Sequence, residues 1–113
     1  MATNKEIAGT IIDAYVRLRQ SSEKIFISYG EMAILIGRGG QHALLGAPLD
    51  QVRDICADLG IPDIATMVVN MDALKSGTLM PSGSAIEKHS GWPGLRKEQA
   101  RAITFDWMSY KLR

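Results

Sequence analysis

The sequence predicts a small α+β domain in which three to four helices accompany a β-hairpin. Two observations indicate this class: apolar residues recur at helical spacing in several segments, and short β-prone runs lie between them. At 113 residues with 46% hydrophobic composition, the chain is long enough for one hydrophobic core and too short for two. We therefore expect residues 1–113 to form a single domain.

The first helix is predicted by its cap and by its apolar spacing. Thr3 and Glu6 have the pattern of a capping box, and an apolar stripe follows through residues 4–20. A β-prone run at 25–27 then predicts a short strand.

A second capping box predicts the next helix. Ser28 and Glu31 repeat the pattern, and a short apolar segment leads to Gly37, a residue type that commonly ends helices. The glycine turn at 38–40 follows, and residues 41–45 are expected to form about one helical turn.

The third helix is predicted over residues 48–59. Pro48 suits its first turn, and Gly60 ends it. Its polar face carries an acidic stripe that phosphates would repel, so this helix is a poor candidate for binding in a DNA groove. The stripe consists of Asp50, Asp54 and Asp58.

The second half of the chain predicts a hairpin and a last helix. Extended runs at 64–70 and 78–80 flank Lys75-Ser76-Gly77 and together predict a β-hairpin. Residues 81–94 are expected to be an irregular connection, with a helix from Leu95 onward. Residues 103–105 could instead form a short strand. This order of elements is close to that of a winged helix-turn-helix, in which the hairpin is the wing.

Composition and charge narrow the function classes. Thirteen basic residues against 12 acidic ones leave a net charge of +1, so no strong overall field favours nucleic acid or a membrane. The single cysteine, Cys56, cannot form an internal disulfide, which fits a reducing compartment. The sequence shows neither a signal-type segment nor an apolar run long enough to span a bilayer, so we expect a cytoplasmic protein.

Catalytic and metal-binding patterns are weak. His42 and His89 are far apart in sequence and lack acidic or cysteine partners at ligand spacing. Cys56 lies on the apolar stripe of the third helix, where it is expected to be a small buried hydrophobe. We expect no enzyme activity, no metal and no cofactor.

One segment carries a family resemblance. The stretch ISYGEMAILIGR, residues 27–38, resembles the start of the helix-turn-helix in alkylguanine DNA alkyltransferases and their non-catalytic alkyltransferase-like relatives. The matching residues are Tyr-Gly-Glu at 29–31, Ala33 and Gly-Arg at 37–38. The resemblance implies a winged helix that binds DNA, with a following short helix entering the minor groove.

This chain departs from the family at two places. The segment 41–45 that matches the minor-groove helix lacks the arginine that replaces a flipped base. The segment 60–69 stands where the family has its nucleophilic cysteine, and it contains no cysteine, so alkyl transfer is not expected. The resemblance covers about 12 of the 113 residues.

DNA binding is the first functional hypothesis. A glycine turn lets the backbone approach a phosphate, an arginine adds charge, and side chains just after the turn can reach base edges. The candidate DNA-contacting residues are Tyr29, Arg38, Gly39, Gly40, Gln41 and His42, with Lys75 at the tip of the wing.

A protein-interaction module is the alternative, for example a small phage or mobile-element protein that inhibits a host nucleic-acid or defence machine. The near-neutral charge, the acidic stripe and a tryptophan in a loop favour it. Its candidate contact residues are Trp92, Arg96, Lys97 and Arg101. The DNA hypothesis requires the basic residues to share one face, whereas the interaction hypothesis predicts an apolar patch around Trp92.

Overall fold

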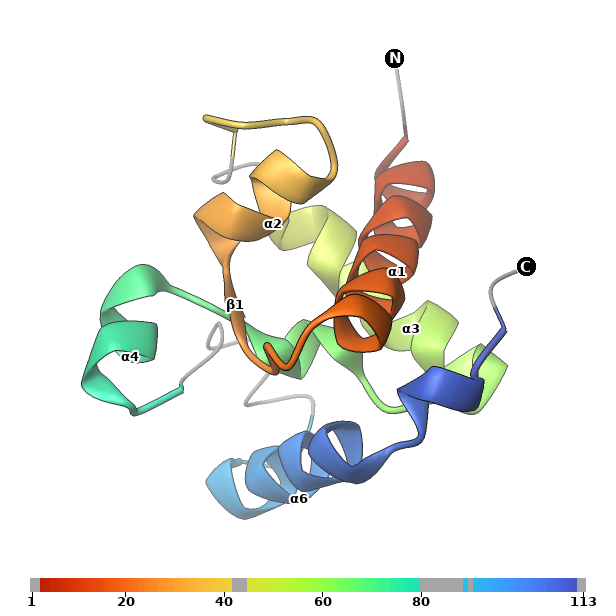
Figure 1. Cartoon of the computed structure of the whole chain (residues 1–113), viewed down its shortest axis with the longest axis vertical. Helices are drawn as coiled ribbons and strands as arrows, with labels where there is room; N and C mark the ends of the chain where they lie inside the picture. Colours follow the sequence, from red (N-terminus) through yellow and green to blue (C-terminus); the bar gives the residue numbers. More distant parts are fainter. Residues whose placement is uncertain (1–2, 42–44, 80–88, 90, 112–113) are drawn as a thin grey trace.

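A computed structural model describes residues 3–41, 45–79, 89 and 91–111 (Figure 1). The described residues are mostly helical and include one small sheet. The α-helices are α1 (Asn4–Ser21), α2 (Tyr29–Leu35), α3 (Gly46–Leu59), α4 (Met71–Ser76) and α6 (Trp92–Thr104). The strands are β1 (Ile27–Ser28) and β2 (Val68–Val69), and the 3₁₀ helices are η2 (Ile64–Met67) and η3 (Trp107–Ser109). Helices accompanied by a small sheet agree with the predicted α+β class.

Both predicted capping boxes form. The Thr3 hydroxyl accepts from the Glu6 amide at 3.1 Å, and the Glu6 carboxylate accepts from the Thr3 amide at 3.1 Å. Ser28 and Glu31 repeat this exchange at the start of α2. Because these bonds satisfy amides that have no partner inside the helix, the helix starts could be located from sequence.

The predicted β-hairpin is wrong for the described residues. β2 pairs with β1 instead, in parallel, with Ile27 opposite Val68. The segment predicted to hold the hairpin turn is helix α4. Its start is capped by the Asn70 side chain, which accepts from the Ala73 amide at 2.7 Å, and it ends at Gly77 with φ 77°. These two helix-end signals outweigh the β-propensity on either side.

Two helix boundaries differ from the prediction. α3 starts at Gly46, before Pro48, and α6 starts at Trp92 rather than Leu95. Trp92 therefore belongs to a helix and not to an irregular loop. α6 ends at Thr104, and Phe105 turns to extended backbone, so neither a helix through to the C-terminus nor a strand at 103–105 is present.

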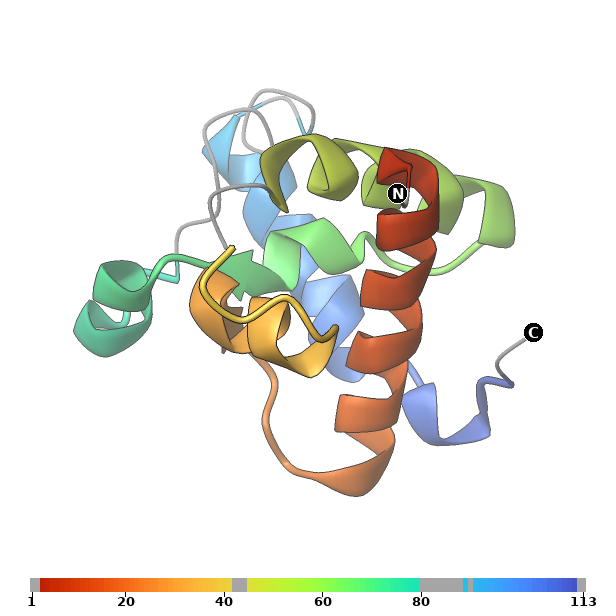
Figure 2. The same cartoon turned by 90° about the horizontal axis from the view of Figure 1, so that it is seen from above.

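The core lies between α1, α3 and the C-terminal segment (Figures 1 and 2). Tyr15 on α1 is fully buried, donates its hydroxyl to the Ile25 carbonyl at 2.7 Å and meets the Trp107 ring edge-on at 5.5 Å. Arg19 donates to the Ala102 carbonyl at 3.0 Å. These contacts hold the end of α6 and η3 against α1.

The elements are arranged around this core along one long axis. In Figure 1, α2 lies at one end and α6 at the other, and α4 stands out to the side in both views (Figures 1 and 2). Surfaces on α2 and α6 are therefore well separated. Within the described residues, no helix has both the length and the apolar character needed to cross a membrane.

Candidate functional site

The turn predicted to contact DNA lies at the surface. Gly39, Gly40 and Gln41 are exposed, and Gly37 and Gly40 adopt positive φ values of 77° and 83° that favour glycine. The Arg38 amide donates to the Ala33 carbonyl at 2.7 Å and closes the end of α2.

The other residues of that prediction have different environments. Tyr29 is the first residue of α2 and is half-buried against the core. Lys75 lies in the last turn of α4, so its predicted position at the tip of a hairpin wing is wrong. His42 is outside the described residues.

The residues predicted to bind a protein partner all lie on α6. Trp92 is 37% exposed, and the Arg96 guanidinium covers its ring at 4.7 Å from the centroid. Arg96 also donates to the Thr78 carbonyl at 2.6 Å, so its first role is to attach the segment after α4 to α6. Lys97 is exposed, and Arg101 pairs with Glu98 on the same helix. Most of the 81–94 segment predicted to adjoin Trp92 lies outside the described residues.

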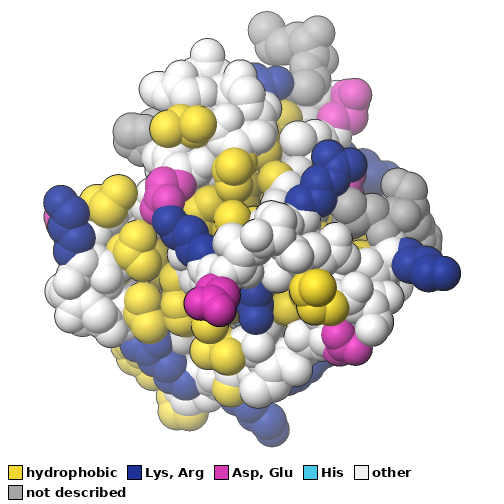
Figure 3. Space-filling model, viewed as in Figure 1, with side chains coloured by type: hydrophobic (Ala, Val, Ile, Leu, Met, Phe, Trp, Pro, Cys, Tyr) yellow, Lys and Arg dark blue, Asp and Glu magenta, His cyan; other side chains and the backbone are white. Residues whose placement is uncertain are grey.

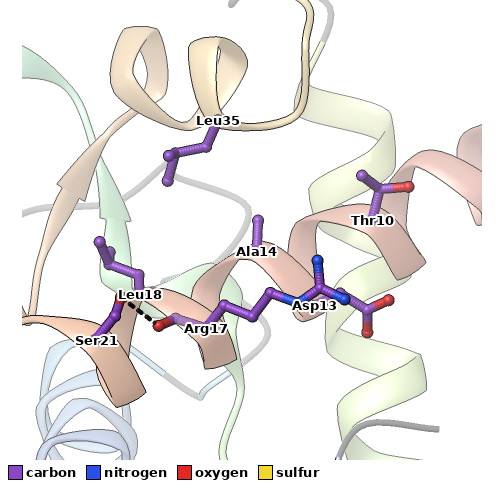
Figure 4. A pocket seen from close by; sticks show the side chains of 7 residues that line it. All are labelled: Thr10, Asp13, Ala14, Arg17, Leu18, Ser21 and Leu35. Atoms are coloured by element: carbon purple, nitrogen blue, oxygen red, sulfur yellow. Dashed lines mark hydrogen bonds between the residues drawn. The ribbon is translucent and has the colours of Figure 1, made fainter.

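A stronger apolar surface lies between α1 and α2, which we call the α1–α2 groove. Ile34 and Leu35 on α2 are 68% and 49% exposed, respectively. Two hollows of about 330 and 270 Å³ meet here, and both are lined by Leu18 and Leu35 (Figure 4). On this face, hydrophobic side chains gather between charged groups (Figure 3).

Polar side chains border the α1–α2 groove on two sides. On α1, the first hollow is lined by Thr10, Asp13, Arg17 and Ser21 (Figure 4). On the other side, Lys24 pairs with Glu31, and this contact lowers the pKa of the Glu31 carboxyl. Within the described part of the chain, no hydrogen bond or ion pair engages the side chain of Arg17 or Asp13.

The sequence contained a signal for this surface. Residues 32–36 are five consecutive apolar residues on a short helix. A helix buries one face against a core, so a run of that length must leave some apolar side chains exposed. Met32 and Ala33 are buried, and Ile34 and Leu35 are the ones left outside.

A second pocket of about 230 Å³ lies between α3, the connection at residues 60–63 and α6, and His89 also lines it. His89 Nε2 lies 2.7 Å from Asp63 Oδ2, so His89 has the acid partner that the sequence did not predict. The Asp63 amide donates to Glu98 at 3.1 Å, and Glu98 accepts from Arg101 at 2.7 Å. Burial raises the pKa of the Asp63 carboxyl, and the hydrogen bond from His89 opposes that shift.

Cys56 lies close to this pocket but does not supply a nucleophile. It is fully buried, and desolvation, with smaller contributions from the charges of Asp63 and Glu98, raises its pKa to about 12. The thiol is therefore protonated at neutral pH, in keeping with its predicted role as a small hydrophobe. In the described ranges, no three His, Cys, Asp or Glu side chains are arranged to hold a metal ion.

No protein-family model, curated protein or solved structure matches this chain. The similarity to alkyltransferase-like proteins therefore stays a prediction from a short segment.

Proposed function

We propose that this protein is a non-enzymatic interaction module whose α1–α2 groove binds an amphipathic helix of a partner protein. The exposure of Ile34 and Leu35 beside the apolar hollow that they line supports this proposal most directly. Fully burying such a side chain contributes about 1.5–3 kcal/mol, so covering the exposed 68% of Ile34 would contribute about 1–2 kcal/mol. A monomer gains nothing from leaving two such side chains in water next to each other.

The borders of the groove define the partner's charge. Apolar side chains spaced along one helix face match the floor formed by Leu18 and Leu35. Arg17 and Asp13 lie at the border, each without an ion-pair partner among the described residues, whereas Lys24 and Glu31 neutralise each other. We therefore infer that the partner helix carries an acidic residue against Arg17 and a basic residue against Asp13, beside its apolar stripe.

The test uses displayed peptides of about 15 residues with leucines at helical spacing and random flanking positions. Peptides selected on the wild-type protein are then measured by fluorescence anisotropy against Ile34→Ser, Leu35→Ser and Met108→Ser. Met108 is 69% exposed and lies on η3, so it is a matched control for Ile34 at 68%. Comparing unfolding midpoints shows whether each variant retains its fold.

We expect each groove variant to weaken peptide binding by about tenfold and Met108→Ser to change it by less than about twofold. Selected peptides should be enriched in Asp or Glu, and Arg17→Gln should weaken binding of those acidic peptides alone. Equal binding to Ile34→Ser and wild type would overturn the proposal. Sedimentation of the free protein provides a further check, because wild-type dimers abolished by Ile34→Ser would show that the groove takes a second copy.

DNA binding remains a second candidate, supported by the position of Arg38. Arg38 comes directly before the exposed glycines 39 and 40, and its side chain has no hydrogen-bond or ion-pair partner among the described residues. The proposal treats α2, the turn and α3 as a helix-turn-helix in a winged-helix-like domain. Duplex DNA titrated at low salt should bind wild type and Lys97→Ala alike, and should bind Arg38→Ala more weakly, with affinity falling as salt rises. Absence of binding at low salt would eliminate this candidate.

A further inference from the structure

Two opposite charges lie one helical turn apart at the border of the α1–α2 groove. They belong to Asp13 and Arg17 of α1, and no hydrogen bond or ion pair engages either side chain within the described part of the chain. Beside them, Ala14 and Leu18 point toward Leu35 of α2 (Figure 4). Because the two charges are opposite, they attract no net charge, but they favour a partner that presents opposite charges in the matching order.

The groove is long enough for a partner helix of about three turns. Thr10 and Ser21 mark its two ends along α1, and eleven positions of helix correspond to a length of about 16 Å. A helix of about 15 residues, which is only marginally stable on its own in water, covers this length. The two charges therefore face the middle of the partner helix, whichever way it runs.

The direction of the partner helix decides the order of its charged residues. The proposed function, on which this inference rests, places an acidic residue against Arg17 and a basic residue against Asp13. Residues four apart share one face of a helix. In a partner that runs antiparallel to α1, the acidic residue comes four positions before the basic one, whereas in a parallel partner it comes four positions after.

Two physical effects favour the antiparallel direction. A glutamate four residues before a lysine stabilises an isolated helix more than the reverse order does, so this partner is more helical before it binds. The macrodipoles of neighbouring antiparallel helices also attract, because the positive end of each lies beside the negative end of the other. The capped N-terminus of α1 lies beyond the Thr10 end of the groove, so the C-terminus of the partner belongs at that end.

A second copy of α1 has the required charge order but lacks the apolar residues. Asp13 precedes Arg17 by four positions, as the inferred partner requires. The neighbouring side chains on this face of α1 are small: Thr10, Ala14 and Ser21. Larger apolar side chains are needed to fill hollows of about 330 and 270 Å³. A partner protein with leucines at helical spacing therefore fits the groove better than a second copy does.

We propose that the partner helix lies antiparallel to α1 and carries an acidic residue four positions before a basic residue, beside its apolar stripe. The acidic residue contacts Arg17, and the basic residue contacts Asp13. In the parallel direction the same helix would place like charges against each other. The groove therefore selects a partner by the order of two charges as well as by the apolar stripe.

The test compares three synthetic peptides of about 15 residues, with acetylated and amidated ends that remove the terminal charges. All have leucines at the same helical positions, one glutamate and one lysine. In the first peptide the glutamate comes four positions before the lysine beside the leucines, and in the second the two are exchanged. The third is the matched control, because it carries the same two residues on the face opposite the leucines.

Fluorescence anisotropy measures the affinity of each peptide for wild type, for Ile34→Ser and for a double variant. The double variant combines Asp13→Arg with Arg17→Asp, which reverses the charge order on α1 and leaves the net charge unchanged. Unfolding midpoints show whether both variants retain the fold. A nitroxide at the N-terminus of the first peptide reports its direction, because it broadens the backbone NMR signals of the nearest residues.

We expect the first peptide to bind wild type about threefold more tightly than the second or the third. The double variant should bind the second peptide at least as tightly as the first. The nitroxide should broaden the signal of Ser21 more than that of Thr10.

The outcomes separate this inference from the proposed function. Equal binding of all three peptides, or stronger broadening at Thr10 than at Ser21, overturns the inferred direction, even where Ile34→Ser still abolishes binding and so supports the groove. If no peptide binds wild type, or if Ile34→Ser binds as tightly as wild type, the proposed function fails and the inference fails with it.

Discussion

Gln99→Leu should destabilise the fold by about 2–4 kcal/mol, although leucine is similar in size and more apolar. Gln99 is 3% exposed, and its amide donates to the Thr66 carbonyl at 3.0 Å and to the Leu79 carbonyl at 2.9 Å. Its own carbonyl accepts from Arg96 at 2.7 Å. One side chain thus attaches α6 to η2 and to the segment that follows α4.

The magnitude follows from the partners that lose their bonds. Each hydrogen bond contributes about 0.5–1.5 kcal/mol net, and a carbonyl left buried without a donor costs about 1–3 kcal/mol. The Thr66 carbonyl lies in a fully buried residue, so the higher cost applies there, whereas Leu79 and Arg96 are nearer the solvent. The gain from burying leucine offsets part of the loss, which leaves about 2–4 kcal/mol.

Urea denaturation followed by circular dichroism measures this difference. Gln51→Leu on α3 is the matched control, because Gln51 is exposed and the same substitution there should change stability by less than about 0.5 kcal/mol. Gln99→Leu should also lower the melting temperature by roughly 10 °C. If both variants unfold at the same urea concentration, the three hydrogen bonds of Gln99 do not stabilise the fold as argued.

Three further predictions concern single groups. Ser28→Ala removes the acceptor for the Glu31 amide at 3.1 Å and should cost about 1 kcal/mol in urea denaturation, whereas Ser28→Asn, which restores a cap, should recover most of it. For Asp63, burial raises the folded pKa above the ordinary 3.8, so its contribution is present below pH 3.8 and is lost as pH rises through the folded pKa. The stability of wild type relative to Asp63→Asn should therefore decline with pH in that interval, and a rise would contradict the assignment. Cys56, with its pKa raised to about 12, should not react with a thiol reagent at pH 8 until the protein is unfolded, and rapid labelling of the native protein would refute its burial.

Local signals located most of the helices. The capping boxes at Thr3 and Ser28 and the terminating Gly60 act between residues that are close in sequence, so their geometry is encoded where they stand. The spacing of apolar residues in the third helix likewise predicted that Cys56 is buried, and it is. The same kind of signal, Asn70 before α4 and Gly77 after it, was present in the sequence but was outweighed in the prediction by the β-prone runs around it.

The pairing of β2 with β1, the contact between Asp63 and His89 and the α1–α2 groove all depend on residues that are far apart in the sequence. Val68–Val69 pairs with a strand about 40 residues earlier, and nothing in a two-residue strand specifies its partner. Asp63 and His89 meet only because α6 packs against η2, and their separation in sequence gives no indication of that contact. For the α1–α2 groove, the sequence could show that α2 has more apolar residues than one face can bury, but not which of them face solvent.

The sequence by itself determined most of the helical segments, their caps and the near-neutral charge, because these depend on neighbouring residues and on composition. Only the tertiary structure decided that Ile34 and Leu35 lie outside the core, that β2 pairs with β1, and that His89 has a carboxylate partner. The physical reason is the same in each case. Exposure and pairing are properties of how elements pack together, and packing depends on residues distant in the chain.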